Sequence, residues 1–151
     1  MPAESSSSLF TTFGPPLVGA LLRSPWETVQ RHMLERLHER GFADLDAAHL
    51  IVFQYPGPQG AKPSELAERL RVTKQALNYL LGQLEHLDYL NRQPDPDDLR
   101  SKRVVLTPRG QAAVGVIREA VGDLESDWAQ RLGPSRFAQL RSLLLEINQY
   151  T

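Results

Sequence analysis

The segment from residue 64 to residue 86 constrains the fold most, because it holds two short helical patterns separated by a turn of three residues. The first predicted helix, Ser64–Leu70, carries its apolar side chains on one side. Thr73 can cap the second helix, which directs four leucines inward: Leu77, Leu80, Leu81 and Leu84. Two helices joined by so short a turn are typical of the helix-turn-helix arrangement.

Two strand-like runs follow, Tyr89–Arg92 and Arg103–Leu106, with alternating or β-branched character. The segment between them, Gln93–Lys102, holds two prolines and three aspartates and predicts a polar hairpin tip. A hairpin directly after a helix-turn-helix forms a wing. The sequence therefore predicts a mainly α fold with a small β-hairpin, a winged helix-turn-helix flanked by N- and C-terminal dimerisation helices.

The N-terminal flank divides at a proline pair. Residues 1–14 are Ser-rich without a helical or strand period and are predicted to be a flexible tail. Ser24-Pro25-Trp26-Glu27 places Ser at an N-cap and Pro at the first helical position, so a helix is expected to restart there. It continues to Arg40-Gly41 with one apolar stripe of Trp26, Val29, Met33 and Leu37. Asp46 is predicted to cap a second helix ending near Tyr55-Pro56.

The C-terminal flank is predicted to be two helices. Thr107-Pro108 caps a helix whose apolar pattern continues to Trp128, and Gly133-Pro134 ends it. The last helix, Ser135–Tyr150, is apolar around more than half its circumference and needs two partners. One intertwined domain is expected, with a tail (1–14), an N-terminal dimerisation region (15–40), a winged helix-turn-helix (45–107) and C-terminal dimerisation helices (108–151).

Composition excludes several classes of function. A chain of 151 residues with 41% apolar and 23% charged residues has the make-up of one globular domain. The absence of cysteine removes disulfides, thiolate nucleophiles and iron–sulfur clusters. No catalytic motif occurs, and His32 and His38 lack the spacing of a helical metal pair, so no enzyme activity, cofactor or metal is expected. Without a long apolar run or a signal peptide, we expect a soluble cytoplasmic protein.

The outward face of the second helix suits a DNA major groove; it carries Lys74, Gln75, Asn78, Tyr79, Gln83 and His86. Glutamine and asparagine amides pair with adenine edges, and a lysine near a helix N-terminus suits a phosphate. A merely solvated polar face is the alternative. Charge favours DNA only weakly, because residues 62–109 carry nine Lys or Arg and seven Asp or Glu, a balance of +2 in a chain of net charge −1.

The wing from Arg92 to Gly110 resembles the signature of MarR-type transcriptional regulators, at Asp98, Arg100, Ser101, Leu106, Thr107 and Gly110. The similarity extends from about Leu34 to Tyr150. The resemblance implies a homodimer with interlocked terminal helices and an arginine at position 100 in the minor groove. It also implies a ligand pocket between the paired terminal helices and each reading head, that is, the winged helix-turn-helix of each subunit. Asp88 stands where family members often have glycine, and the lack of cysteine excludes the thiol-oxidation mode of one branch.

The predicted function is a ligand-responsive repressor that binds a pseudo-palindromic operator as a homodimer. The predicted DNA contacts are Ser64, Thr73, Lys74, Gln75, Asn78, Tyr79, Arg100, Ser101, Lys102 and Arg103. Asp98 is predicted to hold the Arg100 guanidinium by a charge-assisted hydrogen bond. A small aromatic or phenolic effector is predicted near Trp26, His49 and Phe53. The alternative function is a winged-helix module that binds protein instead of DNA.

Overall fold

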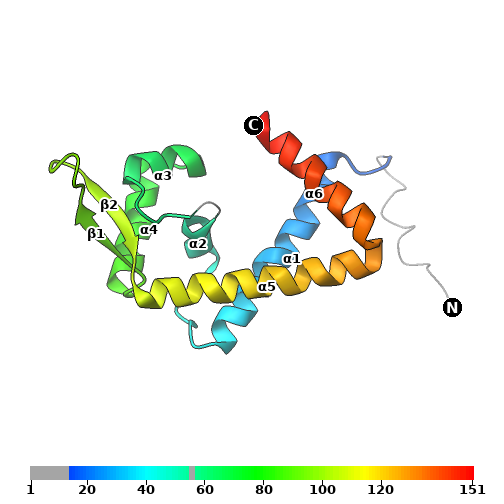
Figure 1. Ribbon diagram of the computed structural model, residues 1–151, viewed down its shortest axis with the longest axis horizontal. Helices are drawn as coiled ribbons and strands as arrows, with labels where there is room; N and C mark the ends of the chain where they lie inside the picture. Colours follow the sequence, from blue (N-terminus) through cyan, green and yellow to red (C-terminus); the bar gives the residue numbers. More distant parts are fainter. Residues whose placement is uncertain (1–13, 55–56) are drawn as a thin grey trace.

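The computed structural model describes residues 14–54 and 57–151, which form a mainly helical fold with one hairpin (Figure 1). In chain order the elements are α1 (Val18–Glu39), α2 (Ala47–Leu50), η2 (Ile51–Phe53), α3 (Pro63–Leu70), α4 (Lys74–His86), β1 (Leu90–Pro94), β2 (Lys102–Leu106), α5 (Pro108–Leu132) and α6 (Pro134–Gln149). The predicted fold class is confirmed. Residues 1–13 of the predicted tail and the predicted helix end at Tyr55-Pro56 lie outside the described residues.

Helices α3 and α4 form the predicted helix-turn-helix. Arg71 ends α3 in the left-handed conformation (φ 55°), which turns the chain sharply enough for α4 to begin three residues later. The Thr73 hydroxyl oxygen accepts a hydrogen bond from the Ala76 amide at 3.0 Å and caps α4 as predicted. Leu77, Leu81 and Leu84 are fully buried, so α4 is fixed by its leucine face and presents its polar face outward.

Strands β1 and β2 pair antiparallel, with Leu90 opposite Leu106 and Pro94 opposite Lys102. They are therefore longer than predicted, and the wing tip is correspondingly shorter. The other edge of β2 bonds to the loop before α3: the Gly60 amide donates to the Val104 carbonyl (2.7 Å), and the Val104 amide donates to the Ala61 carbonyl (2.8 Å). Since both edges of β2 are paired, the wing is fastened directly to the base of α3.

Helix α1 runs unbroken from Val18 to Glu39 with Pro25 inside it, so the prediction of a new helix capped by Ser24 is wrong. Proline removes one amide donor from the helix, which leaves a carbonyl of the preceding turn without its usual partner. This part of α1 is exposed, and water can bond that carbonyl. The inward stripe is also shorter than predicted, because Met33 and Leu37 are buried whereas Trp26 is 42% exposed.

The predicted stop of α1 at Gly41 is confirmed. Gly41 has φ 93°, its amide donates to the His38 carbonyl, and the Phe42 amide donates to the Leu37 carbonyl at 2.9 Å. These two bonds satisfy the last carbonyls of the helix in a Schellman arrangement. Asp46 then caps α2 as predicted by accepting from the Ala48 and His49 amides.

The start of α5 joins the wing to α4, the predicted DNA-reading helix, through Thr107. Its amide donates to the Tyr89 carbonyl (3.1 Å), its hydroxyl donates to the Asp88 carbonyl (2.5 Å), and its hydroxyl oxygen accepts from the Gly110 amide (3.0 Å). A Cβ on Gly110 would lie 1.9 Å from the Tyr89 carbonyl oxygen. Glycine is thus required here by a close backbone approach. Asp88, at the position where family members often have glycine, adopts the left-handed conformation (φ 66°).

The buried Tyr89 side chain reinforces the same joint. Its hydroxyl donates to Asp44 at 2.5 Å, and the Arg109 guanidinium both pairs with Asp44 (2.8 Å) and lies 4.7 Å from the centre of the Tyr89 ring. Burial, followed by the hydrogen bond to Asp44, raises the pKa of Tyr89 to about 12. The hydroxyl therefore keeps its proton and its role as a donor well above neutral pH.

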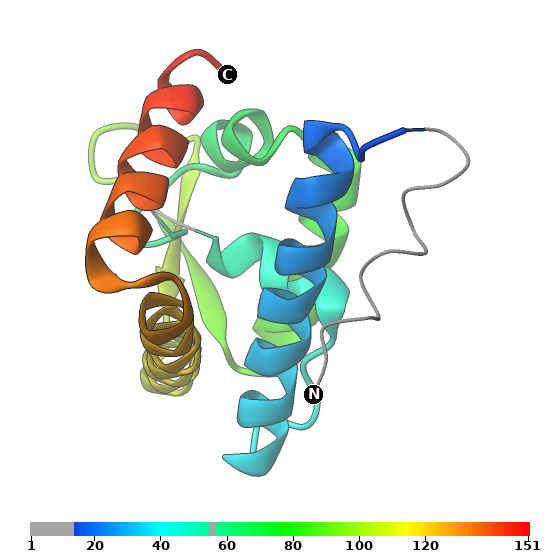
Figure 2. The same cartoon turned by 90° about the vertical axis from the view of Figure 1, so that its right-hand side faces the viewer.

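Helix α5 extends from the winged part to α6, and α1 packs across it (Figures 1 and 2). Two ion pairs join the helices, Arg36 with Asp123 (2.5 Å) and Arg40 with Glu119 (3.2 Å). None of the α6 side chains is buried. Across residues 14–54 and 57–151, no helix is both long enough and apolar enough to cross a membrane.

Gly110→Ala is expected to lower the free energy of unfolding by roughly 3 kcal/mol, because the new methyl group must push apart the α5 start and the Tyr89 backbone. The matched control is Gly115→Ala in the same helix, where a Cβ meets nothing within 4 Å. That change is expected to stabilise the helix by about 0.5–1 kcal/mol. Urea denaturation of both variants measures the difference, and equal effects would contradict the close-approach argument.

Candidate nucleic-acid interface

The predicted contact residues of the reading helix share one exposed face. Thr73, Lys74, Gln75, Asn78 and Tyr79 are all exposed, and Ser64 is exposed in the first turn of α3. Tyr79 is notable, because 68% of this aromatic residue is accessible. A helix end with a lysine and an amide side chain in its first turn can bind a phosphate and a base edge at the same time.

Two side chains modify this face in ways that helical spacing did not predict. Arg92, on β1, donates from its guanidinium to the Asn78 side-chain oxygen at 3.3 Å and pairs with Glu85 at 3.6 Å, so the wing is tied to the reading helix beside this face. Gln83, predicted to point outward, is half-buried and hydrogen bonded to His49 at 3.1 Å. His86 is exposed as predicted.

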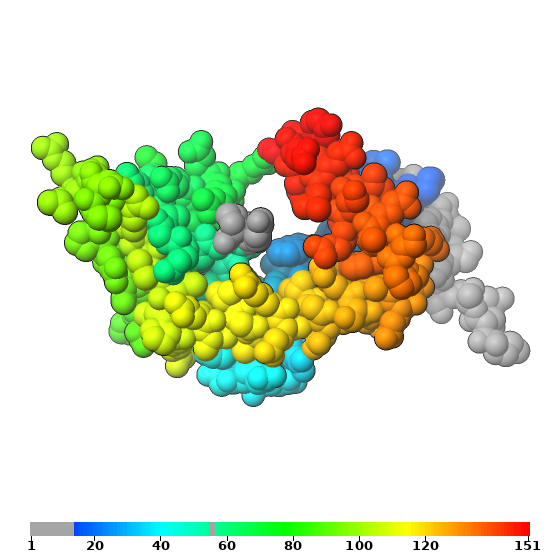
Figure 3. All heavy atoms as spheres, in the orientation of Figure 1, coloured from blue at the N-terminus to red at the C-terminus, as the bar shows by residue number. Residues whose placement is uncertain are grey.

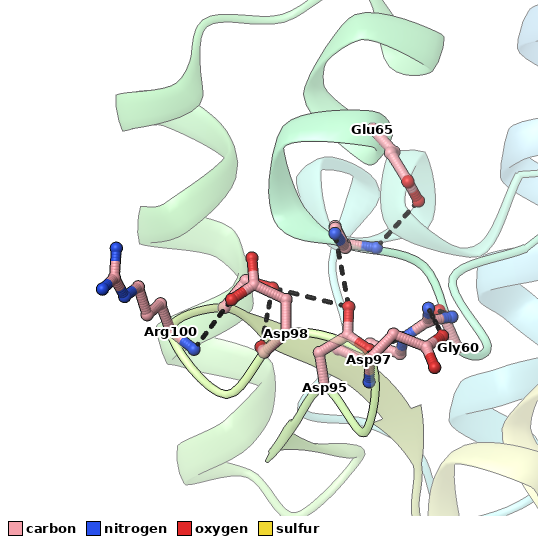
Figure 4. Close-up of polar contacts among 9 residues, drawn as sticks. Gly60, Glu65, Asp95, Asp97, Asp98 and Arg100 are labelled. Carbon is pink, nitrogen blue, oxygen red and sulfur yellow. Dashed lines mark hydrogen bonds and ion pairs between the residues drawn. The ribbon is translucent and has the colours of Figure 1, made fainter.

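The base of the wing is built around Asp95, which is fully buried. Its carboxylate lies 3.0 Å from the Arg103 guanidinium and 3.3 Å from the Lys62 ammonium, and it accepts a hydrogen bond from the Asp97 amide at 3.0 Å. The Asp97 amide bond, aided by Arg103 and Lys62, lowers the pKa of Asp95 to about 2. Figure 4 shows this cluster between the hairpin and the start of α3.

Arg103 belongs to this anchor. It is half-buried, pairs with Asp95 and Asp97, and donates to the Gly60 carbonyl at 3.0 Å. Its predicted role as a DNA contact would require those bonds to be shared or broken. Ser101 is half-buried as well, and its hydroxyl donates to the Asp98 carbonyl at 3.2 Å. Lys102, another predicted DNA contact, is exposed.

The tip of the wing presents Arg100. Asp98 accepts a hydrogen bond from the backbone amide of Arg100 at 3.1 Å, so the predicted bond from Asp98 to the guanidinium is not the one formed. A carboxylate two residues before an amide closes a local turn more readily than it reaches past the backbone to a long side chain. Figure 4 shows the Arg100 side chain extending away from the cluster, with Asp98 fixing only its backbone.

The structure does not bring the three predicted effector residues together as a pocket. His49 and Phe53 are buried in the core of the winged part, whereas Trp26 lies on the exposed portion of α1. An apolar cavity of about 140 Å³ lies instead between α1, α5 and α6, and it is lined by Val29, Val121, Leu124, Glu125, Trp128, Phe137, Leu140, Arg141 and Leu144. The sequence pattern gave no signal for this cavity, because its lining residues come from three separate helices.

Residues 43–101, which hold the helix-turn-helix and most of the wing, match the family model described as MarR family. The winged helix-turn-helix part of this chain is therefore similar to that of the MarR family, whose named members among the matches below are transcriptional regulators.

A curated relative and several solved structures show the same similarity. The chain is 31% identical over 85 residues to the uncharacterised HTH-type transcriptional regulator YkoM of Bacillus subtilis (strain 168); the match covers 56% of this chain and 54% of YkoM, so it spans about half of that relative. The reduced form of MarR from E. coli is 26% identical, covering 88% of this chain and 97% of that chain with a TM-score of 0.70. An S. aureus MepR mutant bound to an oligodeoxyribonucleotide shares the fold at 20% identity, with coverages of 90% and 99% and a TM-score of 0.55.

Asp95→Asn is expected to lower the melting temperature at neutral pH, because it leaves Arg103 and Lys62 without their carboxylate. The lowered pKa of Asp95 means that its stabilisation is complete above about pH 4, the range of an unfolded carboxyl, and is lost as pH falls toward 2. The difference in melting temperature between parent and variant should therefore shrink between about pH 4 and pH 2.

The control for this experiment is Asp97→Asn, whose side chain is 86% exposed in a surface ion pair with Arg103. Exposed pairs contribute little, so this variant should melt close to the parent. Melting curves across pH, followed by circular dichroism, provide the comparison. A difference that stays constant from pH 7 to pH 2 would show that Asp95 is not held as a carboxylate in the folded protein.

Proposed function

We propose that this chain is a homodimeric, ligand-responsive repressor that binds a pseudo-palindromic operator, with α4 in the major groove and the wing in the adjacent minor groove. The observation that carries the proposal is the combination of an anchored wing base with a free wing tip. Within the described part of the chain, Arg100 is exposed and no carboxylate pairs with its guanidinium. An exposed arginine at the tip of a wing whose base is anchored suits the negative potential of a narrow minor groove.

The reading helix supports the same proposal. Gln75 and Asn78 are exposed amides that can bond adenine in the major groove, and Lys74 stands near the α4 N-terminus, where a phosphate is favoured. Arg92, which donates to Asn78 and pairs with Glu85 at 3.6 Å, lies beside that face. The balance of +2 over residues 62–109 is more favourable to DNA than the net charge of −1 suggests.

Exposed apolar side chains at the end remote from the wing support a homodimer. On α1, Leu21 is 56% and Leu22 is 49% exposed; on α6, Leu143 is 50% and Leu145 is 61% exposed. Figure 3 shows α6, in orange and red, on the surface at this end. A two-fold dimer would place its two reading helices about 34–36 Å apart, one turn of B-DNA, which accounts for a pseudo-palindromic operator.

The effector part of the proposal draws on the cavity between α1, α5 and α6. Trp128 and Phe137 supply aromatic walls, and Glu125 and Arg141, 3.6 Å apart, supply polar groups at its lining. A small aromatic or phenolic acid fits this chemistry. Because α5 also begins at the wing, a ligand held here would act on the element that carries the reading head.

Arg100→Ala and Gln75→Ala are expected to weaken DNA binding differently. Loss of Arg100 should lower affinity for all duplexes and reduce the salt slope by about one unit, since it removes a contact with the charged groove. Loss of Gln75 should relax base preference at one position of each half-site by about 1–3 kcal/mol. Titrations of duplexes selected from a randomised DNA library, and of unrelated DNA, at several salt concentrations measure both effects.

Arg118→Ala on the exposed face of α5 serves as the control for loss of a positive charge away from the proposed DNA and dimer interfaces, and it should leave both parameters near those of the parent. Unchanged affinity and salt slope in Arg100→Ala would mean that the wing does not touch DNA. The alternative, a winged-helix module that binds protein, would then account better for the exposed polar face.

Leu145→Lys is expected to weaken dimerisation by at least about tenfold, because it places a charge in the proposed apolar interface. Leu99→Lys is the matched control, since Leu99 is 83% exposed at the wing tip, far along the chain from α6. Light scattering over a range of concentrations measures both variants. A parent protein that is a stable, folded monomer at micromolar concentration would refute the dimer.

A further inference from the structure

Three hydrogen-bonding side chains connect the buried core to the exposed face of the reading helix. His49, only 4% exposed, lies 3.1 Å from the Gln83 side-chain oxygen through its Nε2 atom. Gln83, half-buried on α4, donates from its amide nitrogen to the Tyr79 hydroxyl oxygen at 3.1 Å. Tyr79 is 68% exposed and ends the chain of contacts at the surface.

The donor and acceptor of each hydrogen bond in this His49–Gln83–Tyr79 series follow from one backbone amide. The Asp46 N–H lies 3.1 Å from His49 Nδ1, and a backbone N–H can only donate. The Asp46 carboxylate oxygen also lies 3.3 Å from Nδ1, but it already accepts hydrogen bonds from the Ala48 and His49 amides at 2.9 and 3.2 Å. Nδ1 must therefore be the acceptor and carry no proton, which places the ring proton of the neutral imidazole on Nε2. Nε2–H then donates to the Gln83 oxygen, and the remaining amide group of Gln83 faces Tyr79 as a donor.

The hydroxyl of Tyr79 thus receives a hydrogen bond from within the protein. Because its oxygen is engaged as an acceptor on that side, its own proton is free to point toward solvent. We propose that His49 and Gln83 are positioning residues that make Tyr79 a hydrogen-bond donor toward an acceptor on DNA. This proposal rests on the DNA-binding function proposed above. It adds that Tyr79 is the donor, and the DNA the acceptor, in one hydrogen bond of that interface.

Location on α4 supports this role. Gln75, Tyr79 and Gln83 are spaced four residues apart and follow one face of the helix, so Tyr79 stands next to the amide assigned to base edges. A phenol without internal partners can either donate or accept. One whose oxygen already accepts favours phosphate oxygens and the N7 or O6 atoms of guanine over the amino groups of adenine and cytosine.

The local fold keeps this arrangement fixed. His49 is the third residue of α2, and the Asp46 carboxylate caps the same turn by accepting from the His49 amide at 3.2 Å. The hydrogen bond that fixes the position of the ring proton therefore comes from Asp46, the N-cap residue of α2. Burial of His49 excludes water from competing for Nδ1.

The test combines two substitutions and their double variant. Duplexes that the parent protein selects from a randomised library are the probes, and the variants are Tyr79→Phe, Gln83→Met and both together. Tyr79→Phe should weaken binding about tenfold, because it removes a donor to a charged or polar acceptor. Gln83→Met, which keeps length but not hydrogen bonding, should weaken binding about threefold alone and have no further effect once Tyr79 is Phe.

Gln111→Met on the exposed start of α5 is the control and should leave binding unchanged. An equal loss on selected and unrelated duplexes would assign the acceptor to a phosphate, and a loss confined to one base pair would assign it to a base edge. Independent effects of the two substitutions would overturn the relay while leaving DNA binding intact. A parent that selects no duplex would overturn both the proposed function and this role of Tyr79.

Nitrogen-15 spectra of the His49 ring give a readout that does not depend on DNA. The proposal requires a bare Nδ1 and a protonated Nε2 in the free protein, as the Asp46 amide dictates. In Gln83→Met the Nε2–H resonance should shift, since its acceptor is lost, while the proton remains on Nε2. A proton found on Nδ1 would contradict the assigned directions of the hydrogen bonds from His49 to Gln83 and from Gln83 to Tyr79, and would overturn the proposal.

Discussion

The backbone carbonyl of Tyr89 is the contact on which the arrangement of this protein depends. It accepts the Thr107 amide and lies so close to the start of α5 that only a glycine can occupy position 110. The reading helix, the hairpin and the long helix α5 all meet at this point, and the Tyr89 ring fastens it further through Asp44 and Arg109. A shift there would move the reading head relative to every residue that supports it.

Much of the fold could be predicted because the ends and buried faces of its helices depend on residues close together in the sequence. Caps at Thr73, Asp46 and Thr107, the stop at Gly41 and the leucine face of α4 each depend on residues within one or two turns. The resemblance to MarR-type regulators rested on the wing, and the matched family model covers residues 43–101, most of the same region. Local physics and family pattern therefore pointed to the same fold.

The errors arose where distant residues decide the outcome. Pro25 has the pattern of a helix start but lies within α1, where the exposed surface lets water bond the carbonyl that proline leaves without a partner; local sequence does not reveal that exposure. Asp95, Asp97 and Asp98 look alike in the sequence, but Asp95 alone of the three is buried, where it meets Arg103 on β2 and Lys62 at the start of α3. The hydrogen bond from His49 to Gln83 joins α2 to α4 and leaves no periodic signal.

Helix α5 gives the molecule a mechanical property. Its 25 residues make a rod of about 37 Å at 1.5 Å per residue, joined firmly to the wing at one end and to α6 at the other. A tilt of about 5° at the α6 end moves the wing end by about 3 Å, close to the ~3.4 Å spacing of successive bases along a strand. A tilt of this size is thus enough to displace the winged helix-turn-helix by about one base step along DNA.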